Sequence, residues 1–318
     1  MTDSAPRRDG AGGRILAVVG PTATGKSDLA IALALALDGE IVNADAMQLY
    51  RGMDVGTAKL PVDQRHGIPH HQLDVLEVTE EASVAAYQAA ARRDLTAILD
   101  RQRVPILVGG SGLYVRAALD HLDIPPTDPA VRSRWEARLA SEGVEALYAV
   151  LGQRDPVAAT RIEPRNGRRI VRALEVIELT GKPFSATLPQ RRSVWPTTVI
   201  GLALDRPALD ARIDGRSAAM FDRGLLDEVS HLLAHGLAHG RTARTAIGYA
   251  QAIACLAGDL SRVEAIAQTA TLTRKFARRQ QSWFGADPRI CWLPADAPDL
   301  LDQALALWRA AQQEEWPL

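Results

Sequence analysis

The sequence predicts an α/β protein in which helices flank a parallel sheet and an all-α insertion domain interrupts the sheet. Three observations lead to this prediction. A glycine-rich loop near residue 20 lies between an apolar run and a helical segment, apolar runs of strand length alternate with helical segments, and residues 125–194 contain only helical patterns. The 318 residues, 47% of them hydrophobic, suffice for one large domain and one smaller domain.

The glycine-rich loop is GPTATGKS at residues 20–27, which has the glycine, lysine and hydroxyl spacing of a P-loop. An apolar run at 15–19 precedes it and a helical segment at 28–37 follows it. Backbone N–H groups of such a loop surround phosphate oxygens, while Lys26 adds a positive charge and Ser27 a hydroxyl for Mg²⁺. We therefore expect a P-loop NTPase-like sheet that binds two or three linked phosphates. The expected contacts are Gly20, Pro21, Thr22, Ala23, Thr24, Gly25, Lys26 and Ser27.

Two later strands also end in candidate binding loops. Residues 40–43 form a predicted strand that ends just before Asp45, and residues 104–108 form another that ends in the loop GGSG at 109–112. Because ligands bind at the carboxyl edge of parallel strands, Asp45 is expected beside the P-loop. Motor and switch NTPases usually place a Mg²⁺-binding aspartate where this chain has Gly-Gly-Ser, so the sequence argues against those classes.

The segment at 46–69 contains glycine and proline without a sustained period, which predicts an irregular functional loop. His70 and His71 follow it without a third ligand at metal spacing, so we expect a structural role for this pair. Helices are predicted at 83–99 and 113–119.

A proline-rich break at 123–129 begins the purely helical region. Arg165, Arg169 and Arg172 are predicted on one face of a helix there, because their spacing is close to one turn. We expect a disordered tail at 1–13, a core domain at 14–124 and 195–318, and an insertion domain at 125–194. Helices are predicted at 130–141, 144–151, 156–161 and 166–180.

The strand pattern returns at 198–204, and the following helix at 206–223 carries Arg212 and Arg216 one turn apart. Two such arginines are suited to a second clamp for an oxyanion opposite the P-loop. A long helix at 263–284 carries a basic cluster of Arg274, Lys275, Arg278 and Arg279. Other elements are predicted at 225–235 and 300–313, both helices, and at 290–293, a strand.

Composition restricts the partners and the location. The net charge is −1, but arginine is clustered in the insertion and in the long basic helix, so the net charge does not exclude a nucleic-acid partner. Cys255 and Cys291 are the only cysteines and lack zinc-ligand spacing, so we expect two free buried thiols. The sequence has no signal-peptide pattern and no apolar run long enough to cross a bilayer, which predicts a cytoplasmic protein without a membrane partner.

Six stretches together carry a resemblance to one family: GPTATGKS, NADAMQLYRGMDVGTAK, VGGSGLYVRAAL, NGRRIVRALEV, AIGYAQAI and TRKFARRQQSWF. In this order, between about residues 15 and 284, the chain resembles bacterial tRNA dimethylallyltransferases (tRNA isopentenyltransferases). Asp-x-x-Gln-x-Tyr followed by Gly-Thr-Ala-Lys is the most specific part. The resemblance implies transfer of a dimethylallyl group from dimethylallyl diphosphate to the N6 amine of the adenine on the 3′ side of the tRNA anticodon, with the diphosphate and Mg²⁺ in the P-loop.

The resemblance also implies residue roles. Asp45 would accept the proton of the adenine amine, Ser111, where many relatives have threonine, would place a hydroxyl near that amine, and Arg216 would help to neutralise the diphosphate. Ala46 stands where many relatives have serine. The residues implied to contact the anticodon stem-loop of tRNA are Asp45, Ala46, Met47, Gln48, Ser111, Arg132, Arg165, Arg169, Arg172, Arg274 and Arg278. We expect a monomer.

Three alternatives remain open at this point. A P-loop isopentenyltransferase could act on free adenine nucleotides, although a mononucleotide would not need the arginines of the insertion. A small-molecule kinase could use the P-loop for ATP, and a P-loop protein could bind RNA without catalysis. Nucleotide binding alone does not distinguish them.

Overall fold

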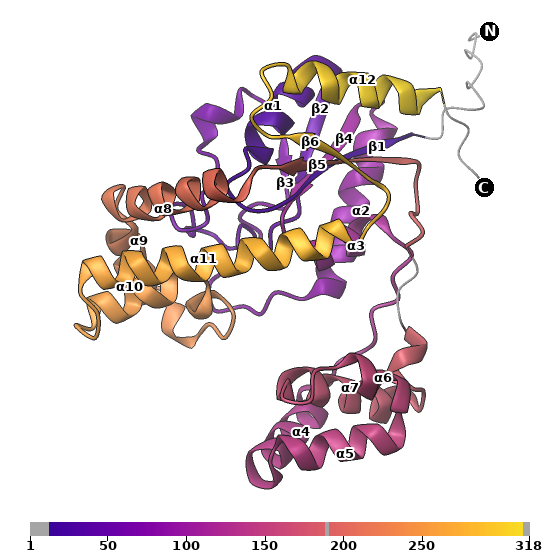
Figure 1. Cartoon of the computed structure of the whole chain (residues 1–318), viewed down its shortest axis with the longest axis vertical. Helices are drawn as coiled ribbons and strands as arrows, with labels where there is room; N and C mark the ends of the chain where they lie inside the picture. Colours follow the sequence, from indigo (N-terminus) through magenta and orange to yellow (C-terminus); the bar gives the residue numbers. More distant parts are fainter. Residues whose placement is uncertain (1–12, 188–190, 314–318) are drawn as a thin grey trace, which may run out of the picture. The chain divides into compact units, whose positions relative to one another are not determined.

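The computed structural model describes residues 13–187 and 191–313 (Figure 1). The tail predicted at 1–13 therefore lies, except for Gly13, outside the described residues. The chain divides into two compact units, each described by itself below. The core unit comprises residues 1–119 and 193–318, and the helical unit comprises residues 120–192.

The core unit is built on one parallel sheet, which has six strands within the described residues, in the order β3-β2-β4-β1-β5-β6. The central strand β1 is buried along its whole length, as expected for a strand covered on both faces. It pairs with β4 on one side, Leu16 beside Ile106, and with β5 on the other. The strands are β1 Ile15–Val19, β2 Gly39–Asn43, β3 His70–His71, β4 Val104–Gly109, β5 Thr197–Ala203 and β6 Ile290–Pro294.

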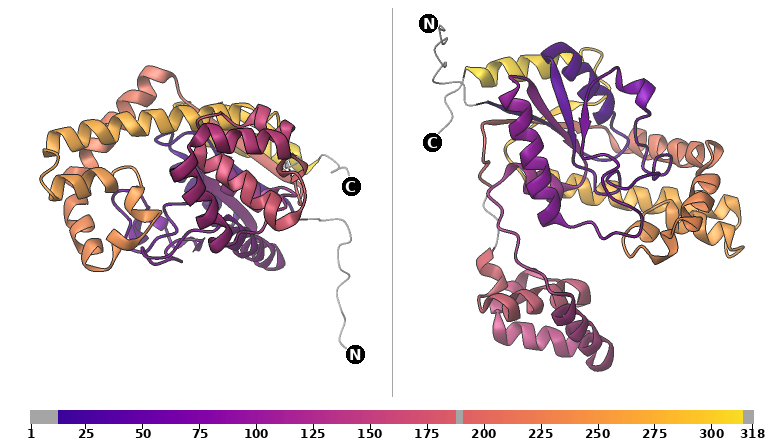
Figure 2. Two further views of the ribbon diagram at one scale, coloured as in Figure 1. Left: turned by 90° about the horizontal axis from the view of Figure 1, so that it is seen from below. Right: turned by 180° about the vertical axis from the view of Figure 1, so that it is seen from behind.

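Helices cover both faces of this sheet. The helices α1 and α12 pack on one face, where Leu33 and Trp308 join the main apolar cluster. The helix α2 covers the opposite face, as the view from behind in Figure 2 shows. Its buried residues Tyr87, Ala91 and Leu95 recur every fourth position, which is the period of a helix with one apolar stripe. These three helices span Lys26–Leu37, Leu300–Gln312 and Val84–Asp100.

A second group of helices lies beside the sheet and buries Tyr50, Met53, Phe221 and Tyr249 in a separate cluster. In Figure 1 the long helix α11 runs beside α10 and reaches α3. The helices of this group, together with α3, are α3 Gly112–Leu119, α8 Arg206–Asp222, α9 Leu225–Ala234, α10 Tyr249–Leu256 and α11 Arg262–Gly285. Short 3-10 turns occur at Val62–Arg65, Leu237–His239 and Ala243–Thr245.

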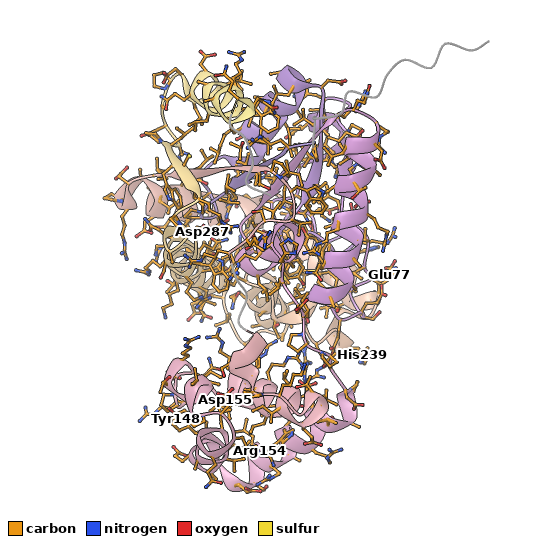
Figure 3. The ribbon with its side chains drawn as sticks, turned by 90° about the vertical axis from the view of Figure 1, so that its right-hand side faces the viewer. Glu77, Tyr148, Arg154, Asp155, His239 and Asp287 are labelled. Carbon is orange, nitrogen blue, oxygen red and sulfur yellow. The ribbon has the colours of Figure 1, made fainter. Side chains whose placement is uncertain are left out.

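The helical unit packs four α-helices around Trp135, Leu147, Leu151 and Leu174 in its described residues. Figure 3 shows Tyr148, Arg154 and Asp155 within this unit. Asp155 caps α6 by accepting the Ala158 N–H at 2.9 Å, and it also accepts the Ser185 N–H at 2.7 Å. The helices are α4 Pro129–Glu142, α5 Val144–Arg154, α6 Pro156–Arg161 and α7 Gly167–Thr180, followed by a 3-10 turn at Phe184–Thr187.

Three details differ from or refine the sequence analysis. Arg165 precedes α7, which Asn166 caps, so the prediction that Arg165 shares a helical face with Arg169 is wrong. The prediction of two buried thiols is wrong, because Cys255 is half-buried and Cys291, on the edge strand β6, is exposed. The structural role of the histidine pair is confirmed: it forms β3, and His71 Nε2 lies 2.7 Å from the buried Glu40 carboxylate. None of the described helices is long and apolar enough to cross a membrane.

Candidate active site

The candidate active site lies where β1, β2 and β4 end at their carboxyl edge. The P-loop follows β1, Asp45 follows β2, and Ser111 follows β4. Because β4 lies between β1 and β2, the three loops are neighbours. A parallel sheet thus gathers residues that are far apart in sequence.

The P-loop turns tightly between β1 and α1. Gly20 has φ 135°, and a Cβ there would lie 2.7 Å from the Leu202 carbonyl oxygen, so glycine is required. The buried Thr24 hydroxyl donates to the Pro21 carbonyl at 2.9 Å and closes the loop. Lys26 Nζ donates to the same carbonyl at 2.5 Å. The lysine charge is therefore held over the loop.

The charges around Lys26 set its proton affinity. Burial lowers the pKa of Lys26 most, Asp45 opposes this effect, and Arg216 lowers the pKa further, to about 8. Burial also lowers the pKa of Arg216, again opposed by Asp45. Lys26, Arg216 and Asp45 thus form one electrostatic cluster, in which the Asp45 charge opposes the effect of burial on both cations. A phosphate anion between the cations would relieve their mutual repulsion.

Arg216 reaches the P-loop from α8, where its guanidinium donates to the Thr22 hydroxyl. The two residues are 194 positions apart in sequence. Arg212, one turn earlier on α8, is exposed. Of the two predicted clamp arginines, the structure therefore brings Arg216 to the P-loop.

Asp45 is held by the backbone and by Asn43. The Asp45 N–H donates to Asn43 Oδ1 at 2.9 Å, and Asn43 Nδ2 donates to the carbonyls of Asp45 and Gln72. Asp45 Oδ1 accepts the Met47 N–H at 3.0 Å. Within the described residues no hydrogen bond is made to the other oxygen, Oδ2. One carboxylate oxygen thus fixes the side chain and the other is free to accept a proton.

Ser111 joins the Asp45 loop to the loop that follows β4. Its N–H donates to the Ala44 carbonyl at 3.3 Å, and its Oγ accepts the Ala46 N–H at 3.2 Å. Gly109 permits this approach, because a Cβ there would lie 2.3 Å from the Ala44 carbonyl oxygen. The serine oxygen accepts a hydrogen bond in this arrangement, so its own hydrogen remains available to donate.

The loop that contains Gly-Thr-Ala-Lys is held by buried polar groups. Lys59 Nζ is buried and donates to the Tyr50 carbonyl at 2.8 Å and to the Asp54 and Asp74 carboxylates, both at 2.6 Å. Gln48 Nε2 donates to the Thr57 carbonyl at 3.1 Å. The motif Asp-x-x-Gln-x-Tyr followed by Gly-Thr-Ala-Lys therefore holds this loop in place beside Asp45.

A carboxylate from α9 holds the same loop from the other side. Glu228 accepts the three successive backbone N–H groups of residues 54–56 at 2.7–3.2 Å. It also accepts the Tyr249 hydroxyl at 2.6 Å. Burial and the adjacent Glu228 carboxylate raise the pKa of Tyr249, so this hydroxyl stays protonated and donates.

Known proteins share this architecture and sequence. Residues 48–287 match the family described as IPP transferase. The chain belongs to the IPP transferase family. It is 58% identical over 298 residues to the tRNA dimethylallyltransferase of Thermobifida fusca, covering 92% of this chain and 93% of that protein. It is also 58% identical over 293 residues to the one of Nocardia farcinica, covering 92% and 94% of the two chains.

Two solved structures of the family resemble the fold. The tRNA isopentenylpyrophosphate transferase of Bacillus halodurans superposes with a TM-score of 0.70 at 36% identity, covering 94% of this chain and 97% of the other. A eukaryotic dimethylallyltransferase acting on tRNA superposes with a TM-score of 0.77 at 28% identity, covering 93% and 77%. The P-loop precedes the residues matched by the family.

Gln280 of this IPP transferase family member is a site residue that the sequence analysis missed. It lies buried on α11, accepts the Thr22 N–H at 2.9 Å through Oε1, and donates to the Gly110 carbonyl at 2.9 Å through Nε2. It therefore connects the P-loop to the Ser111 loop. A signal was present, since this glutamine lies in the buried stripe between Ala277 and Phe284.

Gln280→Ala is expected to destabilise the fold by about 1–3 kcal/mol, because the buried Gly110 carbonyl and the half-buried Thr22 N–H lose their partner. It should also lower turnover by loosening the P-loop. Thermal unfolding and steady-state kinetics would measure both effects, with the exposed neighbour Gln281→Ala as the matched control. Equal melting temperatures for the two variants would contradict the bridging role.

The predicted RNA-binding arginines divide into two groups. Arg132 and Arg172 both donate at 2.8 Å to the fully buried carboxylate of Glu175, and Arg274 pairs with Asp214. Their guanidinium groups are thus engaged inside the units that carry them. The other predicted contacts, Arg165, Arg169 and Arg278, are exposed.

Glu175 is the centre of the first group. Burial alone would raise the pKa of Glu175, but hydrogen bonds from Arg172, Thr127 and Arg132 lower it to about 2. Arg172 also donates to the carbonyls of Pro125 and Pro126 at 2.8 and 3.0 Å. One carboxylate thus holds α4, α7 and the segment that enters the helical unit.

The helical unit is expected to lose stability when Glu175 is protonated or removed. The folded pKa of about 2 lies below the ordinary 4.5, so the stabilisation is complete above about pH 4.5 and is lost as the pH falls toward 2. Glu175→Ala should cost about 3 kcal/mol, because two guanidinium groups lose their counter-ion. Hydrogen exchange of the amides of α4 and α7 would measure this loss. The exposed Glu145→Ala is the control, and equal exchange rates in the two variants would argue against the network.

Proposed function

We propose that this chain transfers the dimethylallyl group of dimethylallyl diphosphate to the N6 amine of the adenine on the 3′ side of the anticodon in tRNA. One observation carries the proposal: Arg216 donates to Thr22 in the P-loop that also holds Lys26, and Asp45, after the strand β2, interacts electrostatically with both cations. Cations beside a phosphate loop suit a diphosphate leaving group, and a carboxylate suits an amine that must lose a proton. The names of the relatives support this assignment.

The P-loop would hold the diphosphate. Cleavage of the allylic C–O bond moves negative charge onto the diphosphate oxygens and leaves positive character on the carbon, so groups that neutralise the leaving group accelerate the reaction. Lys26, Arg216 and the N–H groups of the P-loop would supply this neutralisation. The Thr22 hydroxyl, already bonded to Arg216, would orient the guanidinium.

A divalent cation fits beside this diphosphate. Ser27 at the start of α1 is exposed and its hydroxyl makes no hydrogen bond within the described residues, so it is free to bind a metal. No group of three His, Cys, Asp or Glu in those residues could hold a metal ion. We therefore propose that Mg²⁺ is held by Ser27 and the diphosphate oxygens, the usual arrangement for this ion. It would neutralise further leaving-group charge.

Asp45 and Ser111 would act on the adenine. As the N6 nitrogen forms its bond to the allylic carbon, the C–O bond to the diphosphate breaks and the amine must lose a proton. The free Oδ2 of Asp45 would accept this proton. The Ser111 hydroxyl, fixed by the Ala46 N–H, would hydrogen-bond near the same amine. The products are N6-dimethylallyladenosine in the RNA and free diphosphate.

The RNA would be bound through its phosphates. The exposed Arg165 and Arg169 of the helical unit and Arg278 of α11 are available for this purpose, so we propose that residues 125–194 bind the anticodon stem-loop. The target base must leave the loop to reach Asp45. Since Lys26, Asp45, Ser111 and Arg216 come from one chain, we propose that the monomer is active. We also propose a cytoplasmic location, where tRNA is modified.

The test is a mixture of purified protein, Mg²⁺, labelled dimethylallyl diphosphate and unmodified anticodon stem-loop RNA, with parallel reactions that contain AMP or ATP. We expect label in the RNA with a target adenine and none in RNA with guanine at that position. Label in AMP or ATP alone would instead assign a free-nucleotide prenyltransferase, and phosphate transfer from ATP without prenylation would assign a kinase.

A further inference from the structure

Trp283 on α11 has an exposed indole close to the candidate active site. Its side chain is 42% exposed, and that of Leu113, at the start of α3, is 45% exposed. Burial of such side chains against a partner is favourable, so an exposed tryptophan beside a functional loop points to a binding surface.

Contacts with the Ser111 loop place the indole. A Cβ built on Gly112 would lie 2.1 Å from Trp283 Nε1 and 2.2 Å from Cδ1, so the indole edge rests directly on the backbone next to Ser111. Gln280, one helical turn earlier, contacts Gly110 on the buried side of the same loop. The helix α11 therefore presents a buried amide to one side of this loop and an exposed ring to the other.

The indole has no hydrogen-bond partner among the residues that the structure describes. Within residues 13–187 and 191–313, its N–H makes no hydrogen bond, and glycine at position 112 is needed for the ring to lie where it does. The ring is thus fixed at one edge, while part of its surface remains open to solvent.

Positive charges on the same helix indicate the kind of partner. Lys275, Arg278 and Arg279 are all exposed on α11. Lys275 and Arg279 precede Trp283 by eight and four residues and therefore share its helix face. An aromatic ring on the same face as cations suits an unpaired nucleotide, whose base stacks on the ring while its phosphates contact the cations. A purely apolar partner would gain nothing from these charges.

We propose that Trp283, together with Leu113, forms a stacking platform for the unpaired nucleobase next to the target adenine. This inference rests on the proposed function. The target base must approach Asp45 and Ser111, which are half-buried. The Trp283 indole is exposed and contacts Gly112, the residue after Ser111. The platform therefore receives a neighbouring base and helps to keep the loop open while the target is extruded.

Kinetics of the full-length protein with stem-loop RNA test the platform. Trp283→Ala should raise the KM for RNA about tenfold and leave the KM for dimethylallyl diphosphate unchanged, while Trp283→Phe, which retains an aromatic face, should stay close to wild type. Gly112→Ala should resemble Trp283→Ala, because the added methyl displaces the indole. The control is Trp292→Ala, which removes another exposed indole, 36% exposed on the edge strand β6.

A direct readout is 2-aminopurine placed on either side of the target adenine. At one of the two positions, its fluorescence in the complex should be lower with wild type than with Trp283→Ala, because stacking on the indole quenches it. Circular dichroism and thermal unfolding establish that each variant is folded. If Trp283→Ala does not fold, Trp283→Phe still tests the proposal, because it should bind RNA like wild type.

The outcomes separate the two proposals. If wild type does not prenylate RNA, the proposed function fails. If wild type prenylates RNA, but the KM for RNA and both fluorescence signals are the same in Trp283→Ala, the platform is overturned and the function stands. A change confined to the KM for dimethylallyl diphosphate would also overturn it, because the indole would then belong to the donor site.

Discussion

Asp45→Asn is expected to lower kcat for RNA prenylation by about a thousandfold, since a well-placed general base contributes about 10²–10⁴ in rate. The amide is close in shape to the carboxylate, and its oxygen can still accept the Met47 N–H that holds Asp45 Oδ1 at 3.0 Å. The position facing the substrate, however, would carry an NH₂ group that cannot take a proton. Single-turnover rates with saturating RNA would measure the loss.

RNA affinity distinguishes this role from a structural one. The dissociation constant for stem-loop RNA should change little in Asp45→Asn, because the substitution alters proton transfer and leaves the phosphate contacts in place. The control is Asp28→Asn, which neutralises an exposed carboxylate in the first turn of α1. A rate within tenfold of wild type for Asp45→Asn would assign the proton to another group.

Lys26→Ala is expected to lower kcat/KM for dimethylallyl diphosphate by about 10²–10³, the usual effect of removing one preorganised charge from a developing anion. The loss should appear in the donor kinetics, while RNA affinity stays close to wild type. Arg216 is not expected to replace the lysine, because its guanidinium is already bonded to the Thr22 hydroxyl.

The pH profile gives a second test of Lys26. Its pKa is lowered to about 8, so the free enzyme loses this charge as the pH rises through 8. Since kcat/KM reports ionisations of the free enzyme, we expect it to fall on the alkaline side with a midpoint near pH 8. In Lys26→Arg the side chain should stay charged above pH 8, so kcat/KM of this variant should not fall on the alkaline side. An unchanged alkaline fall in Lys26→Arg would place the ionisation elsewhere.

Much of the fold could be predicted because local signals agreed with the tertiary structure. The helix at Pro156–Arg161 was predicted to the residue, since Asp155 caps it and proline occupies its first position. The strand order could not be predicted, because pairing between β4 and β2 depends on contacts between distant segments. Arg165 was misplaced because helical spacing alone does not show that Asn166 starts a new helix.

The candidate site was predictable where the sheet itself assembles it. Lys26, Asp45 and Ser111 each follow a strand, so the strand-edge rule was enough to group them. Gln280 and Glu228 belong to helices outside the sheet. The buried stripe of α11 marks Gln280 as unusual, but the backbone groups that both side chains hold have no sequence signature. For the same reason, sequence reasoning could not anticipate that Glu175 engages Arg132 and Arg172.

The order in which a ribosome makes this chain separates its two units in time. The helical unit is a continuous segment with its own apolar cluster, so it can fold once residue 192 has emerged. The P-loop is made earlier, but Gln280, which holds its Thr22 N–H, emerges only after the whole helical unit. A nascent chain shorter than 280 residues therefore carries the phosphate loop without its full support. We expect translation to finish the helical unit before the catalytic centre.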